Sequence, residues 1–213
     1  MEYIHNTEQF QFHNTVVALG KFDGMHKGHQ LIFDELIQYK QLGYQAAVFS
    51  FDRPPLNMLK HKHMRVIYTT NEKIKLLARR GIDIYIEHPF TDEFSHLSPE
   101  DFVIKVLLEK TGMKVLVVGD DCGFGYKRQG NVELLERMSK EYDFKLIVIP
   151  KLELEGEIVS STRIRHLLSE GKVEEANRLM EDPFMICGSV VHGNHMGAEV
   201  LQMPTANQIP LED

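Results

Sequence analysis

Short apolar segments alternate with amphipathic segments along most of the chain, and this alternation restricts the fold more than any other feature. The apolar runs of strand length span residues 15–19, 46–51, 82–86, 115–118 and 146–149. The segments with apolar residues at helical spacing span residues 29–41, 69–80, 98–111, 131–142, 161–168 and 173–180. Strands that alternate with helices favour a mostly parallel sheet with helices on both faces, so the sequence predicts an α/β fold.

Local signals mark where several of these helices begin. Thr69 and Glu72 have the spacing of a capping box, in which two side chains satisfy free backbone amides at a helix start. Ser98 followed by Pro99 marks a second helix start, because serine caps helices and proline suits their first turn. We therefore predict one continuous helix in each of these two segments.

The loops after the first, second and fourth predicted strands carry the unusual sequence of the chain. In parallel α/β sheets, ligands bind beyond the carboxyl ends of the strands. We therefore expect the functional site at that edge of the sheet.

Composition narrows the class of protein. Asp plus Glu outnumber Lys plus Arg by 31 to 24 in the 213 residues, and the net charge of −7 disfavours a generally basic surface for nucleic acid. No apolar run reaches transmembrane length, and the N-terminus lacks the pattern of a secretory signal. The two cysteines, Cys122 and Cys187, lie far apart and outside any metal-binding spacing. We therefore expect a cytoplasmic protein with free thiols and no membrane partner.

A break in the pattern near Glu181-Asp182-Pro183 predicts a domain boundary. Residues 1–182 would form the α/β domain. Residues 183–213 are too few to bury a core of their own, so they are expected to be an incomplete second domain or a tail packed on the first.

The first unusual loop runs from Gly20 to His29 and leads into a predicted helix. Its glycines allow sharp turns and a close approach of the backbone to a ligand. The first amides of the helix are free donors, and His26 and His29 add two more groups that can donate hydrogen bonds to phosphate oxygens. This pattern favours phosphate binding.

Two other interpretations of this loop stay open. The histidines can be solvated residues of an ordinary glycine turn. Alternatively, His26, His29 and Asp23 can form a metal site, although the histidines lack the i, i+4 spacing of a zinc helix and no cysteine or glutamate lies nearby in the sequence.

The segment Ser160-Ser161-Thr162-Arg163-Ile164-Arg165 opens a late helix. Its hydroxyl groups can cap the helix or bind an anion at its positive end, and its arginines can bind phosphate oxygens. An ordinary helix cap with solvated arginines explains the same residues. Together with the histidine loop, the segment indicates a second group of ligands for a polyphosphate.

The loop after the fourth strand, residues 119–130, contains four glycines and two aromatic residues. Phe124 or Tyr126 could contact a planar ring, and Asp121 could accept hydrogen bonds from ring N–H groups. A long connecting loop that uses glycine only for its turns is the alternative.

Taken in order, GKFDGMHKGH, GDDCGFGYKRQG and SSTRIR resemble the FAD synthetase (FMN adenylyltransferase) module of the prokaryotic bifunctional riboflavin kinase/FMN adenylyltransferase family. The later segments GSVVHG and PTAN resemble the first strands of that family's kinase module. The resemblance implies a Rossmann-like nucleotidyltransferase fold over residues 1–182, followed by the start of a β-barrel riboflavin kinase module over 183–213.

The resemblance also implies roles for individual residues. The catalytic residues that stabilise the ATP phosphates would be His26, His29 and Arg165. The other residues that bind ATP would be Gly20, Phe22, Asp23, Gly24, Ser160, Ser161 and Thr162. The flavin side would be formed by Asp121, Phe124 and Arg128. Mg-nucleotide binding in the kinase module would involve Thr205 and Asn207.

The sequence departs from the family pattern at several positions. Lys21 stands where asparagine is usual, Arg53-Pro54 stand where proline and histidine are usual, and Cys122 stands where phenylalanine is usual. The first two departures fall in loops that should border the site.

The reaction that the resemblance implies is the transfer of the adenylyl group from ATP to FMN, which gives FAD and pyrophosphate. Mg²⁺ would accompany ATP, without a metal cage made by the protein alone. Riboflavin kinase activity is not expected, since the residues that resemble that module are incomplete.

Two alternatives to this function remain. The first is a related nucleotidyltransferase with another acceptor, such as pantetheine phosphate or a pyridine mononucleotide. The second is a catalytically silent protein that binds flavin or nucleotide, which the altered residues Lys21, Arg53 and Pro54 suggest.

Overall fold

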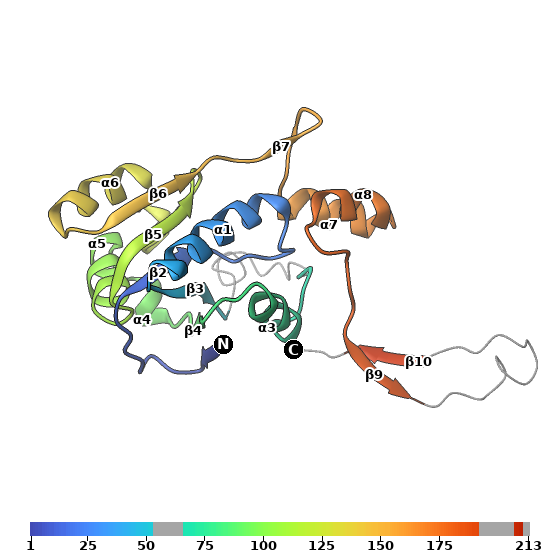
Figure 1. The fold of residues 1–213 in the computed structure, drawn as a ribbon, viewed down its shortest axis with the longest axis horizontal. Helices are drawn as coiled ribbons and strands as arrows, with labels where there is room; N and C mark the ends of the chain where they lie inside the picture. The colour runs from blue at the N-terminus through green and yellow to red at the C-terminus, as the bar shows by residue number, and fades with distance from the viewer. Residues whose placement is uncertain (53–65, 192–206, 211–213) are drawn as a thin grey trace, which may run out of the picture.

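The fold was analysed in a computed structural model, which describes residues 1–52, 66–191 and 207–210. A six-stranded sheet with the order β1-β4-β3-β2-β5-β6 lies at its centre, and all of its strand pairs are parallel (Figure 1). Its strands are β1 (Glu2–His5), β2 (Thr15–Leu19), β3 (Gln45–Phe51), β4 (Ile84–His88), β5 (Met113–Gly119) and β6 (Lys145–Ile149). The predicted parallel α/β architecture is confirmed.

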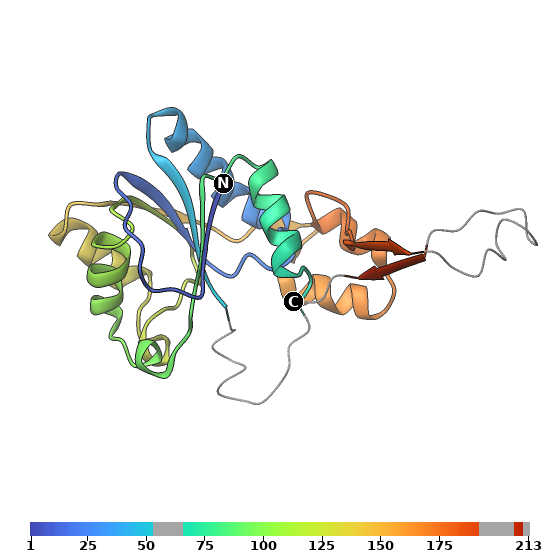
Figure 2. The same cartoon turned by 90° about the horizontal axis from the view of Figure 1, so that it is seen from below.

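Helices cover both faces of the sheet (Figure 2). The helices are α1 (Lys27–Gln41), α3 (Thr70–Arg79), α4 (Asp92–Ser95), α5 (Pro99–Asp101), the π-helix η1 (Phe102–Leu108), the 3₁₀ turn η2 (Tyr126–Arg128), α6 (Val132–Glu141), α7 (Ser161–Ser169) and α8 (Val173–Leu179). Side chains of α1, α3, α7 and α8 pack on one face, and those of η1 and α6 pack on the other.

Burial on both faces explains why residues 15–19 form the central strand β2. All five of its residues are buried, with Val16 and Ala18 in one core cluster and Val17 and Leu19 in the other. A strand that is apolar on both faces requires cover on both sides, which the two helical layers provide.

The predicted helix over residues 98–111 is not one continuous α-helix, and that prediction was wrong in detail. It divides into α5 and the π-helix η1, where the amides of Glu109 and Thr111 donate to carbonyl oxygens five residues back, at 3.0 and 3.1 Å. The apolar spacing of this segment fits a wider helical turn as well as a normal one, so the pattern alone could not distinguish them.

Some strands also differ from the prediction. β4 begins at Ile84 instead of residue 82, because the amide of Ile82 still donates to the carbonyl of Leu77 at the end of α3. β1 was not predicted, since this edge strand has only four residues and exposes its first and last ones. It pairs with β4 alone.

A separate antiparallel pair, β9 (Gly188–Val191) and β10 (Asn207–Pro210), follows the α/β fold (Figure 1). Residues 182–187, between α8 and β9, pack on α3 and the residues just before it. The Cys187 amide donates to the Glu72 carboxylate at 2.6 Å, and the Phe184 ring stacks on Tyr68. The domain boundary after residue 182 stays a prediction.

Candidate active site

The loop between β2 and α1 is tightly folded. Phe22, Gly24 and Met25 have positive φ values of 48°, 85° and 40°. A side chain at Gly24 would also collide with Ile67, since its Cβ would lie 2.8 Å from Ile67 Cδ1. Phe22 is buried against Phe33 and supports the turn from below. The conformation of this loop therefore depends on residues that lie underneath it as well as on its glycines.

His26 caps the N-terminus of α1. Its Nδ1 accepts a hydrogen bond from the His29 amide at 3.2 Å, and the two imidazole rings stack with centroids 3.5 Å apart. His29 Nδ1 is buried and has no partner among the described residues. The two predicted histidines thus lie together at the positive end of a 15-residue helix.

Both histidines are neutral at pH 7 in this structure. Burial lowers the pKa of His26 to about 4. Burial, and then the charge of His26, lowers the pKa of His29 well below its usual value. Because His26 Nδ1 accepts a hydrogen bond, the neutral ring carries its proton on Nε2, which is left as a donor.

This burial predicts a pH-dependent stability. The unfolded chain binds protons at histidine with a pKa of about 6.5, above that of folded His26. The unfolded state therefore gains protons first as the pH falls, and stability is lost between about pH 6.5 and 4. For His26 alone, the loss in free energy of unfolding between pH 7 and 5 is about 2 kcal/mol.

Urea unfolding at pH 7, 6 and 5 measures this loss. The matched variant is His26→Asn, because asparagine keeps an acceptor for the helix cap and removes the titrating ring. We expect the loss in this variant to be smaller by about 2 kcal/mol. An unchanged pH dependence would show that His26 is not buried in its neutral form.

The segment Ser160–Arg165 lies directly against the histidine loop. Ser160 caps α7 by accepting from the Arg163 amide at 3.3 Å. Ser161 Oγ donates to the Asp23 carbonyl oxygen at 2.5 Å, and Arg165 donates to Asp23 Oδ2 through Nε and Nη2, both at 3.4 Å. These partners are 138 and 142 residues apart in the sequence. The structure therefore brings the two motifs together.

Asp23 also holds a third segment, which the sequence did not indicate. Its Oδ1 accepts hydrogen bonds from the amides of Ile67 and Tyr68, at 2.9 and 3.3 Å. Both carboxylate oxygens and the carbonyl of Asp23 are thus occupied by protein donors. Backbone amides such as those of Ile67 and Tyr68 carry no residue signature, which is why sequence reasoning missed them.

The remaining residues of the Ser160–Arg165 segment differ in their surroundings. Thr162 is exposed. Arg163 pairs with Glu157 at 2.6 Å, in the small hairpin of β7 (Glu153–Leu154) and β8 (Glu157–Ile158). Arg165 is therefore the arginine of this segment that faces the histidine loop.

Backbone hydrogen bonds join the two sides of the loop after β5. Phe124 and Gly130 exchange two backbone hydrogen bonds, at 3.2 and 2.9 Å. The Phe124 ring is only 5% exposed and packs on Phe102, in the core beneath the loop. Asp121 is exposed and pairs with Lys151 at 3.1 Å. Contact of Phe124, Asp121 or Arg128 with flavin stays a prediction.

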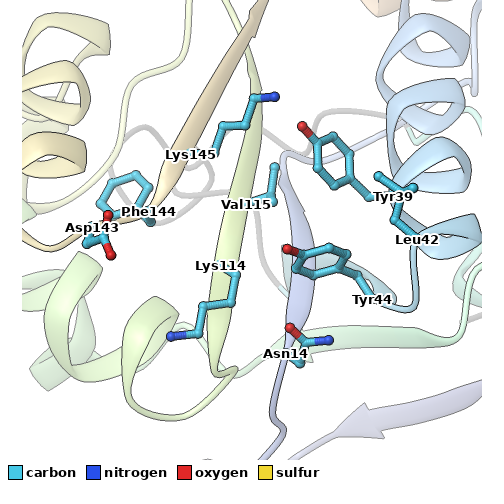
Figure 3. Close-up of a pocket in the computed structure, with 9 residues that line it drawn as sticks. All are labelled: Asn14, Tyr39, Leu42, Tyr44, Lys114, Val115, Asp143, Phe144 and Lys145. Atoms are coloured by element: carbon cyan, nitrogen blue, oxygen red, sulfur yellow. The ribbon is translucent and has the colours of Figure 1, made fainter.

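A cavity of about 700 Å³ lies at the opposite edge of the sheet (Figure 3). Its lining residues are Asn14, Tyr39, Leu42, Tyr44, Lys114, Val115, Asp143, Phe144 and Lys145. They belong to the amino ends of β5 and β6, the approach to β2, and the end of α1 and its following turn. None of the predicted site residues lines this cavity. A second cavity of about 410 Å³ has Arg165 in its wall.

Among the described residues, no group of three or more His, Cys, Asp or Glu side chains could hold a metal ion. Cys122 and Cys187 are free thiols. Burial, reinforced by the charge of Asp121, raises the pKa of Cys122 to about 11, so this thiol is protonated at neutral pH. The described part of the chain also contains no helix long and apolar enough to cross a membrane.

Comparison with known proteins assigns the chain to a family. The FAD synthetase family profile matches residues 8–163, which include the histidine loop, the loop after β5 and the start of α7. The chain belongs to the FAD synthetase family. The family resemblance and the Rossmann-like nucleotidyltransferase fold that it implied are thereby confirmed.

Individual relatives agree with this family. The chain is 39% identical over 207 residues to the bifunctional riboflavin kinase/FMN adenylyltransferase of Buchnera aphidicola subsp. Schizaphis graminum, covering 96% of this chain and 66% of the relative. It is 32% identical over 191 residues to an FAD synthetase of Listeria monocytogenes, covering 89% of this chain and 77% of the relative. This FAD synthetase family chain thus spans about 66% of the length of the bifunctional relative.

A solved structure shares the fold of this FAD synthetase family chain. It is a crystal structure described as that of a macrolide-efflux protein from Streptococcus pneumoniae, with 31% sequence identity and a TM-score of 0.83. The match covers 99% of this chain and 69% of the other.

Of the two residues predicted to bind Mg-nucleotide in the kinase module, the structure describes only Asn207. Thr205 lies outside the described residues, as do Arg53 and Pro54. Asn207 is the first residue of β10 and is exposed. Its role in Mg-nucleotide binding stays a prediction.

Proposed function

We propose that the protein transfers the adenylyl group of ATP to FMN and releases pyrophosphate, forming FAD. The observation that carries this proposal is the junction at Asp23. This residue joins the histidine-capped start of α1 to the serine and arginine at the start of α7. Two sets of phosphate-binding groups therefore meet at one place, as a triphosphate requires.

The triphosphate would lie across the N-terminus of α1. The free amides of the first helical turn, the Nε2 proton of His26 and the guanidinium of Arg165 would donate to its oxygens. His29 would act from the same first turn of α1, beside His26. We assign Gly20, Gly24, Ser160, Ser161 and Thr162 to the surrounding nucleotide site.

The chemical step needs little proton transfer. A phosphate oxygen of FMN attacks the α-phosphorus of ATP, and the bond from that phosphorus to the oxygen bridging to the β-phosphate breaks. The electron pair of that bond leaves with pyrophosphate. Since the second pKa of a phosphate monoester is about 6, the nucleophile is already a dianion near pH 7. The protein's task is to bring two anions together and neutralise them.

Mg²⁺ is proposed to enter with ATP as part of the substrate. The described residues offer no cluster of carboxylates or histidines for it, so its ligands would be phosphate oxygens and water. The two free thiols suit the reducing cytoplasm, which we propose as the location.

The test is to incubate the protein with Mg-ATP and FMN and to separate the products. We expect FAD and pyrophosphate in equal amounts. Pyrophosphate release with pantetheine phosphate or a pyridine mononucleotide, and none with FMN, would favour the related transferase. Binding of ATP and FMN without any product would favour the silent binding protein.

A further inference from the structure

Three cationic residues lie in segments that follow the carboxyl ends of the adjacent strands β2 and β5 or that contact the histidine loop. Lys21 follows β2, Arg128 lies in the loop after β5, and Arg165 lies on α7. Partial burial and the charges of Arg128 and Arg165 lower the pKa of Lys21, and the Asp23 carboxylate opposes them. The lysine therefore stands in a locally positive environment.

Only one of these three cations has an anionic partner in the described part of the chain. Arg165 donates to Asp23. The side chains of Lys21 and Arg128 make no hydrogen bond or ion pair with any described residue. In a protein of net charge −7, two unpaired cations at a ligand-binding edge indicate a site for an anion.

The loop after β5 is shaped to hold the Arg128 guanidinium in place. Lys127 and Arg128 both have left-handed backbone conformations, with φ of 51° and 58°. The guanidinium lies over Gly123, where a Cβ atom would be 2.8 Å from Nη2 and 2.9 Å from Nε. Non-glycine residues in this conformation are unfavourable and are retained where the structure requires them. Gly123 leaves the space that the guanidinium occupies.

The negative charges of the two substrates give these cations a role in the proposed reaction. The triphosphate has its own donors in the start of α1, His26 and Arg165. The acceptor phosphate adds a second dianion, which must approach within bonding distance. We propose that Lys21 and Arg128 bind the phosphate group of the acceptor, and that Gly123 is the positioning residue for Arg128. This inference rests on the proposed function, since it names the groups that recognise the phosphate of FMN.

The two flavins FMN and riboflavin provide the test, because they differ only in that phosphate. Flavin fluorescence titrations would measure the dissociation constants of both for wild type, Lys21→Gln and Arg128→Gln. We expect each substitution to raise the dissociation constant for FMN about 10-fold or more, the usual effect of losing a charge-assisted hydrogen bond. Riboflavin binding should change less than about 2-fold, because riboflavin offers no partner for either cation. Equal effects on both flavins, or no effect on FMN, would overturn the proposal.

Gly123→Ala tests the positioning of Arg128 without removing a charge. The added methyl group would displace the guanidinium, so FMN binding should weaken, by less than in Arg128→Gln because the flexible side chain keeps its charge and can shift. The matched control in the same loop is Gly119→Ala, whose Cβ would meet only Asp121 Oδ1 at an ordinary 3.4 Å. Thermal unfolding of both variants checks that they fold. Folded Gly123→Ala with wild-type affinity for FMN would contradict the role of Gly123.

The outcomes separate this inference from the proposed function. Failure of the wild type to form FAD would reject the proposed function. Loss of the preference for FMN over riboflavin in the variants is read from binding alone, so it supports or rejects the phosphate site independently of turnover. In a protein that forms FAD, the variants should also raise KM for FMN and leave KM for ATP within about 2-fold, because the triphosphate has separate donors.

Discussion

Replacing His29 with alanine should lower kcat for FAD formation by about 100-fold or more. The His29 imidazole lies at the start of α1, stacked on His26, where the triphosphate is proposed to bind. Its low pKa keeps it neutral before ATP arrives. A group held in place in this way stabilises charge that develops in the transition state without first reorganising. Steady-state rates of FAD formation at saturating Mg-ATP and FMN would measure this effect.

A second histidine variant controls for this experiment. His166 lies on α7 next to Arg165 in the sequence, but its side chain is exposed and pairs with Glu170. His166→Ala should leave kcat within about 2-fold of wild type, since solvated side chains of this kind contribute little. If His29→Ala retained the wild-type kcat, the histidine pair would have no part in the chemistry.

Replacing Asp23 with alanine should produce the largest combined loss of stability and activity. The substitution leaves the amides of Ile67 and Tyr68 without their acceptor, and it removes the ion-pair partner of Arg165. We expect the free energy of unfolding to fall by about 3 kcal/mol, because buried donors without partners are costly. We also expect kcat/KM for ATP to fall about 100-fold, since Arg165 loses the contact that orients it. Urea unfolding and initial rates would measure the two effects.

Asp23→Asn separates these two roles. The amide oxygen of asparagine can still accept from the backbone of residues 67–68, whereas its NH₂ group cannot pair with Arg165. Stability should therefore recover in large part, and kcat/KM for ATP should stay low. If Asp23→Asn restored both stability and activity, the ion pair with Arg165 would not matter for the reaction.

The sequence predicted the sheet well because its central strands are mostly apolar segments of strand length. β2, β3 and β5 are runs rich in small or branched apolar residues, and most of these residues are buried. The edge strand β1 and the π-helix η1 were not predicted. The first depends on pairing with a strand about 80 residues away, and the second depends on how its turns fit the sheet.

The candidate site also has parts that the sequence indicated and parts that it did not. The histidine loop and the start of α7 were recognisable from residue types whose chemistry suits phosphate. The contacts of Asp23 with Ile67 and Tyr68 were not recognisable, because the donors are main-chain atoms. Phe22 and Phe124 have a structural role that their sequence context did not indicate. Both stand in glycine-rich loops, yet both rings are buried beneath those loops. An aromatic residue in a loop can support the loop as readily as it can face a ligand.

The Glu72 carboxylate connects the hairpin that follows the α/β fold to the nucleotide site. Glu72 is buried, and it accepts from the Cys187 amide on one side and from the Thr69 amide on the other. The next amide back along the chain, that of Tyr68, is bonded to Asp23. Any domain attached through β9 would therefore be rigidly coupled to Asp23, and its displacement would be transmitted through these hydrogen bonds to the proposed triphosphate site.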